Sequence, residues 1–173
     1  MKEQNDPAQP RYREVQRMRQ WWLWVIVLAA VSPVWYGTAR QIFFDRPFGD
    51  RPLPDGGLVL FWLVFGVGLP VMLYYTHLTT EVRTDGVYYR YWPFHRTFRA
   101  IPFADIEVFE ACTYRPLWEY GGWGIRYGGR RGWAYTVSGK RGVRFQLRSG
   151  RQILLGSREA DKLAQAVRDA IGG

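Results

Sequence analysis

The sequence predicts a two-helix transmembrane hairpin followed by a mainly-β domain of about seven short antiparallel strands and a C-terminal helix. Two long runs without charged side chains predict the hairpin. Short segments rich in β-branched and aromatic residues, each bounded by Gly, Ser, Asp or Pro, predict the strands. An amphipathic stretch at the end of the chain predicts the helix. With 173 residues, the chain has room for one ordinary domain plus an appendage.

The first uncharged run, WWLWVIVLAAVSPVWYG, extends from Trp21 to Gly37 and has 17 residues. That length is close to the lower limit for a helix that crosses a bilayer, and uncharged flanking residues extend the run to position 39. Trp residues begin the run, and Trp35 and Tyr36 lie near its end, where aromatic rings suit the headgroup zone. We therefore predict a transmembrane helix at residues 21–39.

The second uncharged run, GLVLFWLVFGVGLPVMLYYTHL, covers residues 57–78 and predicts the second transmembrane helix. The alternative is a pair of buried core helices, but a domain this small has no core that could surround two all-apolar helices. A cleaved signal peptide is also disfavoured, because the first run begins after twenty residues and lacks a small-x-small cleavage site.

The distribution of Lys and Arg predicts that both termini are cytoplasmic. A basic tail at residues 1–20 carries five Lys or Arg residues, and further Arg residues follow the second run. The connecting loop at 40–56 has three Arg and three Asp, so it is the less basic side. Because Lys and Arg near the ends of spans favour the cytoplasm, we expect the loop to be extracytoplasmic.

The predicted β domain covers residues 79–173. Its first strands flank a tight-turn signal at residues 84–86, Thr-Asp-Gly. Further on, Val143, Phe145 and Leu147 alternate with polar residues, which places three apolar side chains on one face of a strand.

The C-terminal stretch predicts a helix that packs on the sheets. Ser157 is a candidate cap, and acidic residues follow it in the first turn, where negative charge suits the helix dipole. Leu163, Val167 and Ile171 share one face, which must be buried against the strands.

This order of elements is that of the pleckstrin-homology (PH) layout, in which two packed sheets are closed at one end by a C-terminal helix. The run WGIRYG…GWAYTVSGKRGVRFQL, followed by ILLGS and a helix, resembles a family of small bacterial membrane proteins with a PH-like domain. The resemblance covers roughly residues 57–173 and implies a fold, a membrane anchor and the bacterial inner membrane, but no reaction. The first hairpin loop, residues 83–86, is too short and too little charged for phosphoinositide binding.

The most basic part of the chain is residues 121–151, which contain no Asp or Glu and account for eight of the nine net positive charges. No nucleotide-binding glycine motif is present, and strand rather than helix follows the glycines. Nucleic-acid binding is not expected, because alternating aromatics are also what a sheet core needs. Binding to anionic lipid and a merely solvated sheet surface remain open. The candidate surface consists of Arg126, Arg130, Arg131, Lys140, Arg141, Arg144, Arg148 and Arg151.

No catalytic, metal-binding or cofactor-binding residues are predicted. The single cysteine, Cys112, lies in a strand-like segment and is expected to be a packed thiol. Glu107 and Glu110 point to opposite faces of that strand, so their spacing pairs no carboxylates for acid–base chemistry. We therefore expect a non-enzymatic protein whose domain serves protein interaction or self-assembly, through an exposed strand edge or a groove. The alternative is that the basic surface binds anionic headgroups of the inner leaflet.

Overall fold

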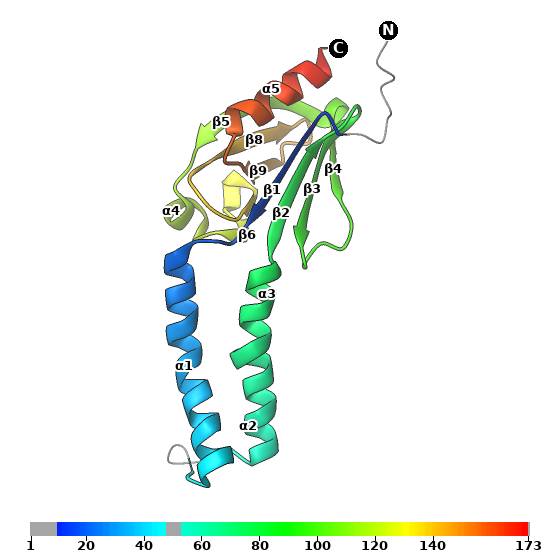
Figure 1. Cartoon of the computed structure of the whole chain (residues 1–173). Coiled ribbons are helices and arrows are strands. Elements are labelled where there is room, and N and C mark those ends of the chain that lie inside the picture. Colours follow the sequence, from blue (N-terminus) through cyan, green and yellow to red (C-terminus); the bar gives the residue numbers. More distant parts are fainter. Residues whose placement is uncertain (1–9, 48–52, 173) are drawn as a thin grey trace. The chain divides into compact units, whose positions relative to one another are not determined.

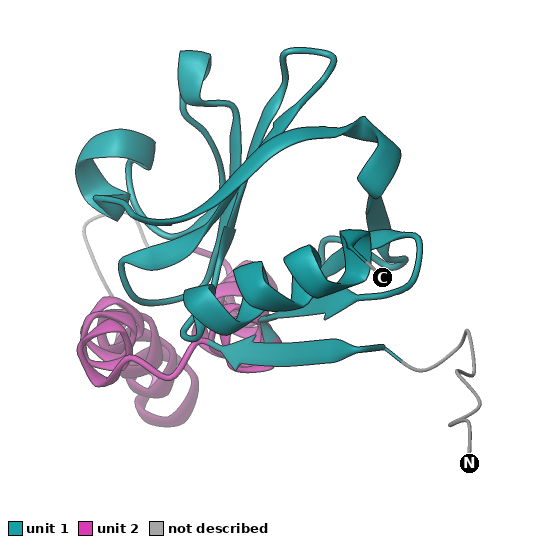
Figure 2. Ribbon diagram, turned by 90° about the horizontal axis from the view of Figure 1, so that it is seen from above, with its two compact units in different colours: residues 1–17, 76–173 teal, residues 18–75 magenta. Residues whose placement is uncertain are grey.

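The computed structural model describes residues 10–47 and 53–172. The chain forms two compact units, shown in different colours in Figure 2. One unit is Met18–Tyr75, and the other combines the chain up to Arg17 with the chain from Thr76 onward. The sequence therefore inserts the first unit between two parts of the second.

The inserted unit is a helical hairpin. Helix α1 spans Trp21–Phe44, and a second helical segment, Asp55–Tyr75, comprises α2 (Asp55–Phe61), the π-helical η1 (Trp62–Gly68) and α3 (Leu69–Tyr75). Both helices are long and apolar enough to cross a membrane, judged by length and composition. Only 22% and 11% of their most apolar windows are buried, whereas a core helix would be mostly buried.

The helix boundaries differ from those expected. Helix α1 continues five residues beyond position 39, and the second helical segment ends at Tyr75 rather than at 78. Leu78 is instead fully buried in a strand of the other unit. The second boundary was misplaced because buried strand residues and lipid-facing helix residues are equally apolar. The uncharged run therefore did not show where the helix ended and the following strand began. Residues 48–52 of the predicted loop lie outside the described residues.

The two helices of the hairpin approach closely at Gly66. The indole Nε1 of Trp35 donates a hydrogen bond to the carbonyl oxygen of Gly66 at 3.0 Å. The Trp35 and Trp62 rings meet edge to face, with centroids 5.1 Å apart. A Cβ at Gly66 would come within 2.9 Å of the Trp62 ring, so a larger residue there would force the Trp62 side chain to shift.

The other unit is a β-sandwich whose first sheet has the order β1-β2-β3-β4 (Figure 1). The strands are β1 (Tyr12–Arg17), β2 (His77–Val82), β3 (Gly86–Trp92) and β4 (Arg99–Pro102), all antiparallel to their neighbours. Strand β1 precedes the hairpin in sequence and β2 follows it, yet the two pair over six positions, from Tyr12↔Val82 to Arg17↔His77. The predicted basic tail at 1–20 therefore contains a strand of the domain.

The second sheet has the order β5-β8-β9-β7-β6. Its strands are β5 (Ile106–Thr113), β6 (Gly124–Tyr127), β7 (Trp133–Thr136), β8 (Arg141–Leu147) and β9 (Gln152–Gly156). The described residues thus contain nine strands rather than about seven, and one pair, β7 with β9, is parallel rather than antiparallel. Alternation along a single strand does not reveal its partner, so the sequence did not show this pairing.

The core lies between the two sheets, and helix α5 (Ala160–Ile171) packs on it as predicted, except that Ile171, expected on the buried face, is 49% exposed at the end of the helix. Val143 and Phe145 on β8 are fully buried, as are Leu163 and Val167 on α5. Helix α5 contacts β5 and β8 of one sheet and β2 of the other. Two sheets with a C-terminal helix are therefore confirmed.

Candidate interaction surface

The eight basic residues predicted as one surface are spread over the second sheet and its connections. They occupy β6, the short 3₁₀ helix η3 (Gly129–Arg131), both ends of β8, the middle of β8 and the β8–β9 turn. The residues, in chain order along these elements, are Arg126, Arg130, Arg131, Lys140, Arg141, Arg144, Arg148 and Arg151. Because β8 separates Lys140 from Arg148 by its whole length, the residues do not converge on one point.

Carboxylates from outside the stretch neutralise part of its charge. Arg141 pairs with Asp161 of α5, with a nitrogen–oxygen distance of 2.7 Å. Arg144 lies 3.6 Å from Glu110 and 3.9 Å from Glu119, and Arg131 lies 3.7 Å from Glu119.

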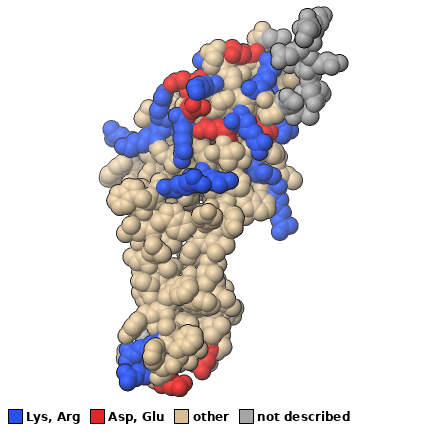
Figure 3. Space-filling view, in the orientation of Figure 1, with Lys and Arg blue, Asp and Glu red and all other residues tan. Residues whose placement is uncertain are grey.

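Acidic and basic side chains are accordingly interspersed over the face of the domain shown in Figure 3. Among the described residues, five of the eight have no ion pair, and they are spread over β6, η3 and the turns on either side of β8: Arg126, Arg130, Lys140, Arg148 and Arg151. The stretch is therefore a partly neutralised sheet surface rather than one uncancelled patch.

A short helix between β5 and β6 is held firmly on the outer face of this sheet. Helix α4 (Pro116–Tyr120) begins with proline and ends at Gly121, whose N–H donates to the carbonyl of Leu117 at 3.1 Å. The Glu119 carboxylate accepts a hydrogen bond from the backbone N–H of Arg115 at 2.8 Å. Tyr120 is buried, so one side of the helix is anchored in the domain.

The other side of α4 exposes two large apolar side chains. Trp118 is 87% exposed and Leu117 is 63% exposed. An exposed apolar residue is ordinary by itself, but an adjacent pair on an anchored helix forms a fixed apolar knob. Exposed Arg115 flanks the pair. We call Leu117 and Trp118 the α4 knob.

A small second core lies beneath α4. It consists of Tyr114, Tyr120, Ala134 and Leu154, and Cys112 packs against it. Burial raises the pKa of the Tyr114 hydroxyl to about 12 and also raises the pKa of the Cys112 thiol. A nucleophilic cysteine needs a lowered pKa, so Cys112 has the character of a packed thiol. Among the described residues, no group of three or more His, Cys, Asp or Glu side chains could hold a metal ion.

A second set of exposed aromatics lies at the end of the first sheet. Trp92, the last residue of β3, is 38% exposed, and Phe94 in the following turn is 59% exposed. Between Phe94 and the rest of the turn, His95 is 8% exposed and directed into the domain, where its ring centroid lies 5.5 Å from that of Tyr135. The backbone N–H of His95 donates to the carbonyl of Tyr91 at 2.8 Å, which closes the turn.

The buried His95 makes stability depend on pH. Burial lowers the pKa of its imidazole, and the nearby Arg99 guanidinium acts in the same direction. The folded state therefore binds a proton less readily than the unfolded state, so its stability is complete above the ordinary His pKa of 6.5 and falls as the pH drops below it. We expect the melting temperature to fall more between about pH 7.5 and about pH 5.5 in the native chain than in His95→Asn. Equal losses in both chains would show that His95 is not responsible.

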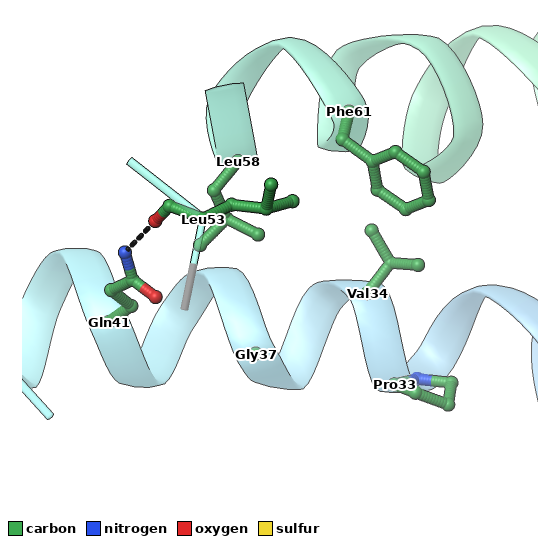
Figure 4. A pocket seen from close by; sticks show the side chains of 7 residues that line it. All are labelled: Pro33, Val34, Gly37, Gln41, Leu53, Leu58 and Phe61. Atoms are coloured by element: carbon green, nitrogen blue, oxygen red, sulfur yellow. Dashed lines mark hydrogen bonds between the residues drawn. The ribbon is translucent and has the colours of Figure 1, made fainter. Parts of the chain in front are cut away.

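The hairpin unit contains a small apolar pocket of about 240 Å³ (Figure 4). Gln41 is the one polar side chain among its lining residues. The Gln41 amide nitrogen donates to the Leu53 carbonyl and to the Asp55 carboxylate, both at 2.8 Å, and thereby ties α1 to the start of α2. A pocket of this composition offers packing space but no acid, base or nucleophile. Its lining residues are Pro33, Val34, Gly37, Gln41, Leu53, Leu58 and Phe61.

Comparison with known protein families identifies the family of the chain. The model of a family of unknown function, DUF6141, matches residues 6–173 and so covers the strand before the hairpin, the hairpin and the sandwich. The chain belongs to the DUF6141 family. No curated protein and no solved structure matches it.

The DUF6141 match agrees with the expected family without an assigned function, and the structure adds residues that the sequence did not single out. Glu119 and Tyr120 anchor α4, while Trp118 remains exposed. The exposed pair Trp92 and Phe94 was missed. A signal for it exists, since no acidic residue occurs between Asp85 and Asp105 around these aromatics.

Proposed function

We propose that this DUF6141 protein is a two-span membrane protein whose non-catalytic β-sandwich binds another protein at the membrane surface. The exposed apolar faces of α1 and of Asp55–Tyr75 support the membrane-spanning part. Large side chains such as Ile26, Leu28 and Leu63 are 57%, 61% and 49% exposed, an arrangement that water opposes and lipid favours.

The pairing of β1 with β2 supports a common side for both ends of the hairpin. Arg17, the last residue of β1, is the register partner of His77, the first residue of β2. The chain therefore leaves the sandwich and re-enters it at adjacent positions. A hairpin inserted there crosses the membrane twice and returns to the same face. The basic residues that flank the spans favour the cytoplasmic face, and we place both termini there.

The α4 knob is the observation that supports a protein partner. Trp and Arg are enriched among the residues that dominate protein interfaces, and such residues act best when they are held rigidly before binding. Trp118 and Leu117 are held in this way by the anchored residues Glu119 and Tyr120, with Arg115 beside them. The fitting partner presents an apolar pocket with an acidic rim.

Site-specific photocrosslinking in the native membrane tests this proposal. A photoreactive residue in place of Trp118 should give a discrete protein adduct, whereas the same residue in place of the exposed Thr84, in the β2–β3 turn, should not. A second crosslinker at Leu117 should give the same adduct. The exposed Val108 on β5 provides a matched apolar control: Val108→Ser should leave the Trp118 adduct unchanged, and Leu117→Ser should reduce it.

The mass of the adduct identifies the partner as a second copy of the chain or a different protein. Lipid adducts alone, or no adduct at either α4 position, would overturn the protein-binding proposal. The other alternative, that residues 121–151 bind anionic lipid, has weaker support because Arg131, Arg141 and Arg144 are paired with carboxylates.

The PH likeness is part of this proposal rather than its basis. Two sheets and a helix that contacts both of them support it. The parallel β7–β9 pair and the separation of β1 from β2 by the hairpin are departures from the simple layout of about seven antiparallel strands. The likeness to bacterial PH-like proteins at the inner membrane therefore supports an anchored module but names no ligand.

A further inference from the structure

The β3–β4 turn, residues 93–98, is fixed by strand register at one end of the first sheet. Arg17, His77 and Trp92 are neighbours across β1, β2 and β3, so the turn that follows Trp92 lies at the end where the chain leaves and re-enters the sandwich. Figure 1 shows this turn at the same end of the sandwich as the C-terminal end of β1. The opposite end of the same sheet carries the β2–β3 turn, with Thr84 exposed at its tip.

Chain length limits how far this end of the sandwich can be from the membrane. Thr76 alone separates Tyr75, the last residue of α3, from His77, the first residue of β2. Adjacent Cα atoms are about 3.8 Å apart and paired strands about 4.8 Å apart, so Trp92 lies within roughly 12 Å of the level at which the chain would leave the membrane. Exposed Tyr74 and Tyr75 mark that level as the headgroup zone.

The turn presents its aromatics outward and rigidly. Inward-facing His95 and its backbone bond to Tyr91 close the turn, while Phe94 is 59% exposed and Trp92 38% exposed. The Tyr91 and Phe94 rings lie 6.1 Å apart, so Phe94 has a fixed neighbour at its base. A loop merely exposed to water gains nothing from holding a phenylalanine at its tip.

The charge at this end also fits a membrane surface. No Asp or Glu occurs between Glu14 and Asp45 or between Asp85 and Asp105, so both segments that meet here lack acidic residues. Arg17 and Arg96 are exposed, and among the described residues neither has an ion pair. Basic side chains near an anionic leaflet attract it, and Trp is a favoured interfacial residue.

We infer that Trp92 and Phe94 insert into the lipid–water interface of the membrane that the hairpin crosses, and so fix the tilt of the sandwich on that surface. The inference rests on the proposed membrane-spanning hairpin. It differs from binding by residues 121–151 in both residues and chemistry, because the contact is aromatic first and electrostatic second. The contact would fix the orientation of the sandwich. A sandwich that is attached to the membrane by its two connections to the hairpin and also by this turn presents the same face to a partner at all times.

Spin-label accessibility in the full-length chain tests the inference. Cys112→Ala removes the single cysteine, and one new cysteine is then placed at Thr97, Thr84 or Leu63 and labelled with a nitroxide. The proteins are reconstituted in nanodiscs of phosphatidylcholine with phosphatidylglycerol. Collision with oxygen, which partitions into lipid, is compared with collision with a water-soluble nickel complex. Thr97 and Thr84 are matched, since both are exposed threonines in turns at opposite ends of β3.

We expect lipid-type accessibility at Leu63, an interfacial value at Thr97 and a fully aqueous value at Thr84. Replacing Trp92 and Phe94 together by Ser should make the label at Thr97 as accessible to the nickel complex as the label at Thr84, and should leave the accessibility at Leu63 unchanged. The double variant Trp92→Phe with Phe94→Trp should keep the interfacial accessibility at Thr97. An aqueous Thr97 beside a lipid-exposed Leu63 overturns the anchor and leaves the spanning hairpin intact. An interfacial Thr97 that persists in the double Ser variant also overturns the anchor. An aqueous Leu63 overturns the spanning hairpin and the anchor with it.

Discussion

A chain in which residues 18–76 are replaced by an Asn-Gly turn should fold as a water-soluble β-sandwich. Arg17 and His77 are antiparallel register partners, and two-residue Asn-Gly loops join strands in this relation. The replacement removes the exposed apolar helices while keeping the nine strands of the described residues and α5. A cooperative thermal transition and dispersed amide resonances should show the fold.

The same sandwich without β1, residues 77–173 alone, should be largely unfolded or aggregated. Losing β1 exposes the edge of β2 along six paired positions. It also removes the buried Gln16 side chain, whose amide donates to the Gly156 carbonyl at 2.6 Å. Leaving that buried acceptor without a donor costs about 1–3 kcal/mol by itself.

A single substitution provides the control that truncation lacks. Gln16→Ala in the Asn-Gly chain keeps strand β1 and should lower the free energy of unfolding by the cost of the lost hydrogen bond. The control Arg17→Ala changes an exposed residue and should have little effect on the free energy of unfolding. If residues 77–173 melt at the same temperature as the chain with β1, the strand is not part of the folding unit, and the domain begins where the sequence suggested.

Strand β1 could not be predicted because its inward face is polar. Tyr12, Glu14 and Gln16 point into the domain, whereas Val15 is 44% exposed. The Glu14 carboxylate accepts hydrogen bonds from the Ser157 hydroxyl at 2.6 Å and from the backbone of Arg158 at 2.9 Å. Apolar alternation, the usual signal for a half-buried strand, is therefore absent. The hydrogen-bond partners of Glu14 and Gln16 lie at least 140 residues away in the sequence, where no local pattern could reveal them.

In the candidate site too, features that depend on neighbouring residues could be predicted, and features that depend on residues far away in the sequence could not. The run of glycines and basic residues at 121–151 correctly indicated turns and strands, because those features depend on neighbouring residues. Whether each Arg is free depends on carboxylates elsewhere in the chain, such as Asp161 for Arg141 and Glu110 for Arg144. The exposure of Trp118 likewise depends on Tyr120 anchoring α4 in a core formed with Leu154. Composition therefore predicted the scaffold better than the surface.

Gly132→Ala should destabilise the sandwich more than any other glycine substitution in this stretch. Gly132 has φ 69° and ψ −155°, a region that is essentially restricted to glycine. A Cβ at this position would overlap the carbonyl oxygen of Gln152, which is backbone and cannot rotate away. The clash lies where β7 starts to pair with β9, so relief would separate Trp133 from Ile153. We expect a loss of at least about 3 kcal/mol in the free energy of unfolding, the upper end for one strained residue.

Gly121→Ala separates backbone strain from the steric overlap. Gly121 also has a positive φ, 70° with ψ 21°, but a Cβ there meets no atom within 4 Å. Gly121→Ala should therefore lower the free energy of unfolding only by the cost of a left-handed backbone conformation, about 1–2 kcal/mol. Urea unfolding of both variants in the Asn-Gly chain measures the difference directly. A larger loss at Gly132 that is accompanied by faster amide exchange in β7 and β9, but not in β5, would place the damage at the parallel pair. Equal losses at the two glycines would mean that β7 shifts freely against β9, and that the parallel pair contributes little to holding the second sheet together.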